Sequence, residues 1–256
     1  MVSIKSEKEI ELMKHSGHIN YLCHKLLEKN IKPGITTGEL EKIAKDFMEA
    51  NDCVSSTIGY EGYPGYLCIS INDEVVHGIP GKRKLKNGDI VKLDISMIYK
   101  GYHSDAARTF AVGEISKEAR QLVDVTRQSF FEGIRYAKAG NHLHDISAAI
   151  QKYAESFGYG VVRELVGHGI GTHLHEDPQI PNFKTIGRGI RLRPGMTLAI
   201  EPMITMGDYA VSVLDDDWTV VTDDNSLAAH YENTVLITEG DPEILTLPNW
   251  DKKEWQ

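Results

Sequence analysis

Residues 167–178, GHGIGTHLHEDP, contain three histidines and three glycines. The histidine side chains could carry out chemistry. Glycine lets the backbone approach another group closely. His168 and His175 are therefore candidates for metal ligation or proton transfer. A polar surface loop would explain one such histidine alone, so partners elsewhere in the chain must decide. Because the stretch has no apolar run, we expect a loop and not a buried strand.

Two aspartates lie in stretches that otherwise resemble apolar strands. Asp94 stands between Leu93 and Ile95, where an ionised carboxylate is costly without a nearby positive charge. Asp105 follows in the next expected strand. A hairpin turning at residues 99–101 would place the two aspartates about opposite each other. Like charges across a strand pair are destabilising, and a cation between them removes that objection.

Two glutamates complete the set. Glu201 lies within the segment LAIEPM, and Glu232 precedes an apolar strand expected at residues 234–238. Each carboxylate alone could be a turn residue or a salt-bridge partner. Together with His168, the four carboxylates form a ligand set whose charge balances two divalent ions. Oxygen-rich ligands favour Mn, Fe(II) or Co over a thiolate zinc site.

The elements that must position these groups follow from helix caps and periodicity. Ser6 with Glu9 and Thr36 with Glu39 form capping boxes, each followed by apolar residues at helical spacing. The expected helices span residues 6–30, 36–47, 116–136 and 142–157, and residues 54–66 read as a loop. The expected strands span residues 67–71, 90–98, 102–112, 161–166, 197–204, 210–214, 218–222 and 232–238. This order predicts an α+β fold with helices packed on an antiparallel sheet.

An internal repeat relates the two halves of the chain. Residues 32–49 align with residues 138–155, and residues 84–96 align with residues 191–203, both at an offset of about 106 residues. The second alignment superposes Asp94 on Glu201. We therefore expect a single domain over residues 1–256, built from two pseudo-symmetric halves of approximately 1–115 and 116–256.

Composition excludes several classes of function. The chain has 256 residues, 25% of them charged, and its net charge of -9 argues against nucleic-acid binding. The three cysteines form no CxxC pair, which fits a reducing, cytoplasmic compartment. The N-terminus lacks the apolar core of a signal peptide, and no stretch is long and apolar enough to span a membrane.

These residues resemble the type I bacterial methionine aminopeptidases, of the M24-like peptidase family, over essentially the whole chain. The matching segments are GYEGYP at 59–64, CISIN at 68–72, VVHGIP at 75–80, KLDI at 92–95, HSD at 103–105, GHGIG at 167–171, HEDP at 175–178, IEPM at 200–203 and YENT at 231–234. The resemblance implies the pita-bread fold of the creatinases and aminopeptidases, with a curved antiparallel sheet.

The resemblance also implies a dinuclear metal site and a reaction. Asp94 and Asp105 would hold one ion, His168 and Glu201 the other, and Asp105 and Glu232 would bridge both. The cofactors would be two divalent ions from among Co, Mn, Fe(II), Zn and Ni. The implied activity is removal of the initiator methionine from nascent proteins whose second residue is small, by water attack on the methionine carbonyl.

The same resemblance implies roles for further residues. Glu201 would take and pass the proton of the attacking water, His175 would stabilise the oxyanion, and His77 would hydrogen-bond the substrate amide. By family position, the methionine pocket would use Tyr60, Tyr63, Cys68, Leu174 and Trp218. Thr57 and Leu174 depart from the Cys and Phe that are frequent there, and His173 lies outside the usual pattern.

Three alternatives and several finer expectations accompany this hypothesis. Aminopeptidase P and prolidase share the ligands but carry a large N-terminal domain, which we do not expect here. A partner-binding relative that has lost its metals should lack a ligand, and a purely structural protein would not place four carboxylates in apolar strands. The type II helical insertion is not expected. The implied partners are nascent N-termini near the ribosome, and a cytoplasmic monomer is expected.

Overall fold

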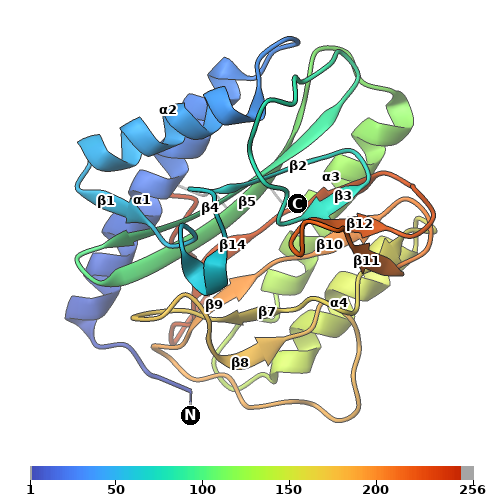
Figure 1. Ribbon diagram of the computed structural model, residues 1–256. Helices are drawn as coiled ribbons and strands as arrows, with labels where there is room; N and C mark the ends of the chain where they lie inside the picture. Colours follow the sequence, from blue (N-terminus) through green and yellow to red (C-terminus); the bar gives the residue numbers. More distant parts are fainter. Residues whose placement is uncertain (1, 249–256) are drawn as a thin grey trace.

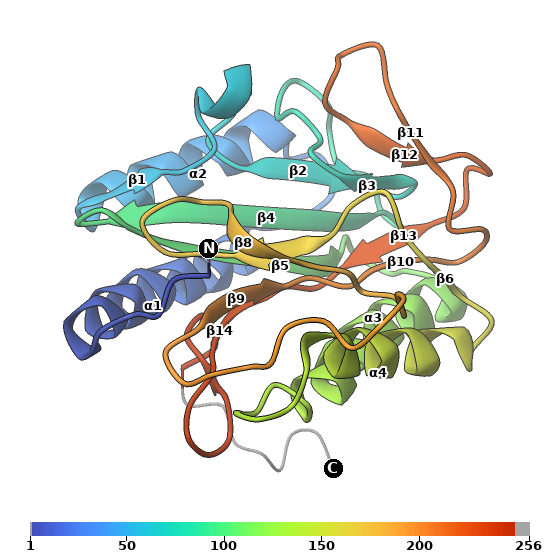
Figure 2. The same ribbon diagram turned by 90° about the horizontal axis from the view of Figure 1, so that it is seen from below.

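The computed structural model describes residues 2–248 and places the strands between two pairs of helices (Figure 1). Helices α1 (Glu7–Asn30) and α2 (Thr37–Ala50) form one pair, and α3 (Lys117–Ile134) and α4 (Leu143–Glu155) form the other. The expected α+β class and all four expected helices are confirmed. Seen from below, the two pairs lie at different ends of the strands (Figure 2).

Capping explains where the first two helices begin. The Ser6 amide donates to Glu9 Oε2 at 2.8 Å, and the Thr36 amide donates to Glu39 Oε2 at the same distance. Each bond satisfies a backbone donor at a helix start. The buried faces of the helices then pack on the strands, with Leu40 and Ala44 against Leu93 in one core. Phe130 and Ile146 pack with Leu198 in a second core.

The first sheet is built around one long strand. Strand β4 (Ile90–Tyr99) pairs with β1 (Cys53–Ser55), β2 (Cys68–Ile71) and β5 (Tyr102–Ala111). The expected facing of Asp94 and Asp105 was wrong, because Asp94 pairs with Ala107 and Ser96 pairs with Asp105. The turn has only two residues, Lys100 and Gly101, both with positive φ, and this short hairpin sets the register.

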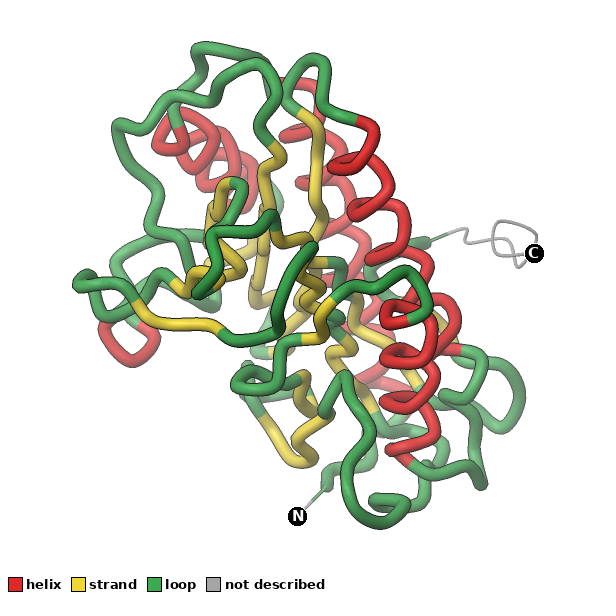
Figure 3. Tube along the Cα trace, turned by 90° about the vertical axis from the view of Figure 1, so that its right-hand side faces the viewer, coloured by secondary structure: helices red, strands yellow, loops and turns green. Residues whose placement is uncertain are grey.

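The second main sheet has the order β15 (Glu243–Ile244), β14 (Asn233–Leu236), β9 (Thr197–Ile200), β7 (Gly167–Gly169) and β8 (Glu176–Ile180). Two small sheets flank the main ones. The first contains β13 (Ala228–His230), β10 (Met203–Thr205) and β6 (Gly160–Val161), and the second contains β11 (Val211–Val213), β12 (Val220–Thr222) and β3 (Glu74–Val76). Figure 3 shows the strands at the centre, with long helices on the right, a further helix at the upper left and loops along the left-hand side.

Several expected strand positions were wrong. The strand expected at residues 161–166 covers only Gly160–Val161. The strand expected at residues 197–204 is interrupted at Glu201 and Pro202, because proline has no N–H to continue the ladder. Residues 167–169 form the buried strand β7 and not the expected loop. The expected loop at 54–66 begins within β1 and contains a 3-10 helix, Tyr60–Gly62.

Two isolated bridges lie at positions that the sequence repeat relates to each other. The isolated bridge between Thr36 and Lys84 has a counterpart between His142 and Arg191. One bridge connects the start of α2 to the loop before β4, and the other connects the start of α4 to the loop before β9. Among residues 2–248, no helix is long and apolar enough to cross a membrane.

Candidate metal centre

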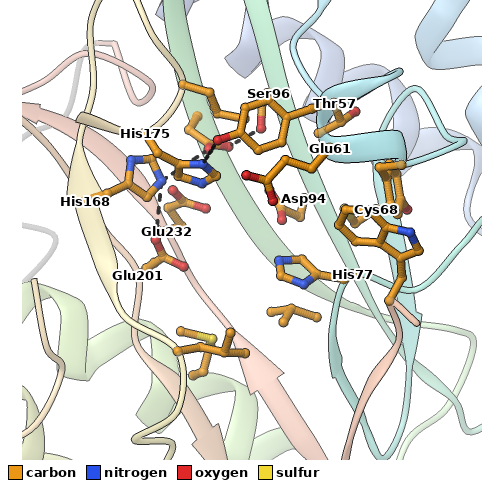
Figure 4. A pocket seen from close by; sticks show the side chains of 18 of the residues that line it. Thr57, Glu61, Cys68, His77, Asp94, Ser96, His168, His175, Glu201 and Glu232 are labelled. Atoms are coloured by element: carbon orange, nitrogen blue, oxygen red, sulfur yellow. Dashed lines mark hydrogen bonds and ion pairs between the residues drawn. The ribbon is translucent and has the colours of Figure 1, made fainter. Parts of the chain in front are cut away.

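One cavity of about 270 Å³ gathers the site residues expected from the sequence (Figure 4). The expected metal ligands that line it are Asp94, Asp105, His168, Glu201 and Glu232. The other expected residues on its wall are Thr57, Tyr60, Tyr63, Cys68, His77, Leu174, His175 and Trp218. His173 does not line this cavity.

The four carboxylates reach the cavity from strands of both main sheets. Asp94 lies on β4 and Asp105 on β5, whereas Glu201 follows β9 and Glu232 precedes β14. The Ser96 hydroxyl donates to Asp105 Oδ1 at 2.7 Å. Asp105 and Glu232 are buried, with 5% and 2% of their surfaces exposed. Strands of the two sheets therefore place four acidic groups at one cavity, and two of these groups are almost completely shielded from water.

A threonine joins the two sheets beside these carboxylates. The Asp105 amide donates to Thr234 Oγ1 at 2.9 Å, and the Thr234 hydroxyl donates back to the Asp105 carbonyl at 2.9 Å. This reciprocal pair connects β5 to β14 where the chain would otherwise leave two backbone groups unpaired. Asp105 and Glu232 are thereby held in a fixed relation.

Burial disfavours the charged forms of these carboxylates. Desolvation raises the pKa of Asp94 to about 7. Burial, followed by the charges of neighbouring carboxylates, also raises the pKa values of Asp105, Glu201 and Glu232. Like charges so close together cannot all ionise unless a cation compensates them.

The donor set fits divalent metal ions. Asp94 Oδ1 and Glu232 Oε1 are buried and have no hydrogen-bond partner in the described part of the chain. Within residues 2–248, two groups could each hold an ion, with ligand atoms lying within 4.8 Å of one another: Asp105 with His168 and Glu232, and Asp94 with His230 and Glu232. Glu232 belongs to both groups, which fits a carboxylate shared between two ions.

His168 has the surroundings of a metal ligand. Its Nδ1 donates to the Gly169 carbonyl at 2.9 Å. Its Nε2 lies 3.6 Å from Glu201 Oε1 and 3.8 Å from Asp105 Oδ2. Burial lowers the pKa of His168 to about 3, so the imidazole is neutral. A hydrogen bond at one ring nitrogen orients the other toward a metal.

Two glycines make room for His168. A Cβ atom at Gly167 would come within 2.4 Å of the Ala199 carbonyl oxygen, and one at Gly169 within 2.1 Å of the Asp177 carbonyl oxygen. Neither contact is possible for a real side chain. The backbone of β7 can lie between β8 and β9 only because both positions are glycine.

His175 and His77 approach the cavity from opposite walls. The His175 ring packs edge-on against the His168 ring at 4.3 Å, and its Nδ1 is 2.7 Å from the Tyr60 hydroxyl. Burial lowers the pKa of His175, and it lowers the pKa of His77 to about 4. His77 has a φ of 60°, a strained conformation for a residue with a side chain. Both imidazoles are neutral near pH 7.

The remaining wall is largely apolar. The Tyr63 ring meets the Trp218 ring edge-on at 5.1 Å, and the Tyr63 hydroxyl donates to the Gly78 carbonyl at 2.9 Å. The Thr57 hydroxyl donates to the Gly65 carbonyl at 3.1 Å. Burial raises the pKa of the Cys68 thiol well above its usual value, which makes the thiol unreactive.

Sequence reasoning missed several residues of this site. Glu61, Ser96, Val76, Leu165, Val166 and Met203 also line the cavity. His230 lies beside the carboxylates, two residues before Glu232. A period of two places alternate residues of an extended chain on one side, so the spacing from Glu232 could have identified His230.

Comparisons with known proteins agree with this geometry. The model of metallopeptidase family M24 matches residues 11–239. Methionine aminopeptidase from Clostridium acetobutylicum is 55% identical over 248 residues, which cover 96% of this chain and 99% of that protein. Methionine aminopeptidase 1 from Bacillus subtilis is 48% identical over 246 residues, covering 96% of this chain and 99% of that protein.

Solved structures give the same result for the fold. A crystal structure of methionine aminopeptidase from Thermotoga maritima has a TM-score of 0.94 and 46% identity, over 96% of this chain and 99% of that one. A prolidase from Pyrococcus furiosus has a TM-score of 0.78 and 23% identity, over 96% of this chain and 66% of that one. These structures confirm the expected pita-bread fold.

Proposed function

The chain belongs to metallopeptidase family M24, and on that premise we propose that it is a methionine aminopeptidase, which removes the initiator methionine from new polypeptides. The observation that carries this proposal is one cavity that joins four carboxylates, two of them buried, and a neutral imidazole to an apolar pocket. Its cofactors are two divalent metal ions. Such ions polarise a carbonyl and lower the pKa of water.

We assign the metal ligands as Asp94, Asp105, His168, Glu201 and Glu232. Their buried, mutually repelling carboxylates and the oriented His168 ring support this assignment. Among these ligands, Asp94 lies next to Cys68, because the two residues face each other in the pairing of β4 with β2. A free α-amine of the substrate would reach this end, and the enzyme would accordingly act only at chain termini.

Three residues would manage protons and charge during the reaction. Glu201 would accept the proton of the attacking water, because its carboxylate lies among the ligands. With the Tyr60 hydroxyl as donor to His175 Nδ1, 2.7 Å away, the ring proton would lie on Nε2 and would stabilise an oxyanion. His77, neutral and on the opposite wall, would hydrogen-bond the substrate amide.

The apolar wall would recognise the methionine side chain. Tyr63 and Trp218 form its aromatic surface, and Cys68 and Leu174 add small apolar contacts. Tyr60 would contact the substrate beside His175. A flexible thioether packs well against aromatic rings, which favours methionine over a charged or branched side chain. We further propose that the enzyme prefers a small second residue and acts as a cytoplasmic monomer near the ribosome.

Metal exchange and substrate choice test this function. The protein would be stripped with a chelator, reloaded with Mn²⁺, Fe²⁺, Co²⁺ or Zn²⁺, and assayed on Met-Gly and Xaa-Pro peptides. We expect release of methionine from Met-Gly peptides by the reloaded protein and none by the stripped protein. Cleavage of Xaa-Pro without Met-Gly would instead indicate a prolidase or aminopeptidase P. Full activity of Asp105→Ala would contradict the proposed metal site.

A further inference from the structure

We propose that His230 is a positioning residue of the metal centre, whose Nε2–H points toward the carboxylates of Glu201 and Glu232 and restrains them, and that it is not itself a metal ligand. This inference rests on the proposed function, because it concerns how that function's metal ligands are oriented. It starts from a buried imidazole for which the reaction described above has no use.

The position of His230 is well defined. It ends β13, has 1% of its surface exposed, and pairs with Met203 of β10. Its amide donates to Thr109 Oγ1 at 3.0 Å, and the Thr109 hydroxyl donates to its carbonyl at 2.8 Å. The backbone of His230 is thus held on both sides, and the ring must project toward the carboxylates.

The ring nitrogens of His230 lack hydrogen-bond partners among residues 2–248. Neither Nδ1 nor Nε2 forms a hydrogen bond within this part of the chain, although both are buried. Nε2 lies 3.7 Å from Glu201 Oε2 and 3.8 Å from Glu232 Oε2. Burying a polar group without a partner is unfavourable, so we expect an imidazole that lies between two carboxylates to interact with them.

The surroundings of Nδ1 indicate whether His230 binds a metal ion or donates a hydrogen bond to the carboxylates. A histidine that binds a metal through one nitrogen almost always donates its other N–H to an acceptor. His168 meets this condition, since its Nδ1 donates to the Gly169 carbonyl. His230 does not, because its Nδ1 has no acceptor. Its single N–H therefore belongs on Nε2, where both carboxylates can accept it.

Glu201 shows what this donor accomplishes. Its Oε1 faces His168 Nε2 at 3.6 Å, whereas its Oε2 faces His230 Nε2 at 3.7 Å. The two oxygens of one carboxylate therefore face two different imidazoles. A donor at Oε2 restrains rotation of the carboxylate and leaves Oε1 on the side of His168. The same N–H faces Glu232, the carboxylate shared by both groups of candidate ligands.

Two substitutions separate a donor from a ligand. His230→Gln keeps an N–H but removes the imidazole, whereas His230→Leu fills the space with an apolar group. Binding of Mn²⁺ to the stripped proteins would be measured by calorimetry, and the visible spectrum of each Co²⁺ form would be recorded. His24→Gln is the matched control, because His24 is also buried with an unpartnered Nδ1 but bonds the Ala106 carbonyl.

We expect His230→Leu to bind Mn²⁺ about 10- to 100-fold more weakly than the unaltered protein, as is typical when a partner of a metal ligand is lost. His230→Gln should bind within about threefold of the unaltered protein, and its Co²⁺ spectrum should be unchanged. His24→Gln should behave like the unaltered protein.

Three results would overturn the proposal. Unaltered Mn²⁺ affinity in His230→Leu would show that the residue plays no part. A shifted Co²⁺ spectrum in His230→Gln would make His230 a ligand, even if His230→Leu failed to fold. An equal loss of Mn²⁺ affinity in both variants would show that the N–H group of His230 is not what matters. Failure of the unaltered protein to bind two ions would instead count against the proposed function.

Discussion

The carboxylates of the metal site oppose the stability of the protein that holds them. Asp94, Asp105, Glu201 and Glu232 lie close together, and burial raises the pKa of each. Removing a buried carboxylate from water is costly, and a second negative charge nearby adds to that cost. The residues that create the binding site should therefore destabilise the metal-free protein.

Asp94→Asn should make the metal-free protein more stable while weakening metal binding. Its free energy of unfolding in a chelator should rise by about 1–2 kcal/mol, because one buried charge is removed and the shape is kept. Urea unfolding with chelator and with Mn²⁺ measures both effects. Asp46→Asn, on the exposed face of α2, should change stability by less than about 0.5 kcal/mol. An equal loss of stability for Asp94→Asn in both conditions would contradict this explanation.

At the scale of elements, the N-terminal segment fastens the turn that carries His175. Lys5 Nζ donates to Glu176 Oε2 at 2.6 Å, and the Ser3 hydroxyl donates to the same oxygen at 2.7 Å. Glu176 Oε1 accepts from the His173 amide at 3.2 Å. Residues before α1 thus hold the start of β8, immediately after His175.

Glu176→Gln should reveal this connection through pH. Burial raises the pKa of Glu176, but hydrogen bonds from Lys5 and Ser3 and the Lys5 charge outweigh it and lower the pKa to about 2. Because the folded pKa is below the unfolded one, the ionised carboxylate stabilises the protein above about pH 4.5. That stabilisation is lost as pH falls from about 4.5 toward 2.

The stability difference between the unaltered protein and Glu176→Gln should be about 2 kcal/mol from pH 7 to 5 and should shrink below pH 4.5. Chemical unfolding at several pH values measures it. A difference that grew on acidification would have the wrong sign for a carboxylate with a lowered pKa, and Glu49→Gln on α2 provides an exposed carboxylate outside this turn for comparison.

The elements differ in how far the sequence predicts them. The helices follow from local signals, such as Ser6 and Glu9, which act within one turn. Strand β7 was missed because its glycines carry no side chains, so a pattern of apolar residues cannot mark it. The pairing of Asp94 with Ala107 depended on the exact length of a turn. The strand register differs from the expected one by two residues, and both aspartates still line the cavity. The proposed ligand set is therefore unchanged.

At the scale of the whole molecule, we propose that residues 1–256 form one domain built from two related halves. Paired contacts support this proposal: the Gly34 amide donates to the Leu85 carbonyl at 2.8 Å, and the Gly140 amide donates to the Leu192 carbonyl at 3.0 Å. Strands β2, β4 and β5 correspond to β7, β9 and β14 in neighbour order. The proposed ligands come from both sets.

Divalent ions should therefore stabilise the whole molecule and not one half alone. At an ion concentration about 100 times the Kd, binding contributes about 2.7 kcal/mol. For a chain of this size, the Tm should rise by roughly 5–10 °C in one cooperative transition. Calorimetry with chelator and with Mn²⁺ measures this shift, and Asp105→Ala should abolish most of it. Two separate transitions, only one of them sensitive to Mn²⁺, would contradict a single domain.

The glycines beside His168 have a consequence for how this protein could vary. Gly167 and Gly169 are not among the residues that line the cavity, but even one added methyl group at either position would collide with a neighbouring strand. A library of random variants sorted by activity would thus return both glycines as intolerant to replacement, alongside His168 itself. Tolerance to replacement alone cannot distinguish residues that perform chemistry from residues that only leave space for it.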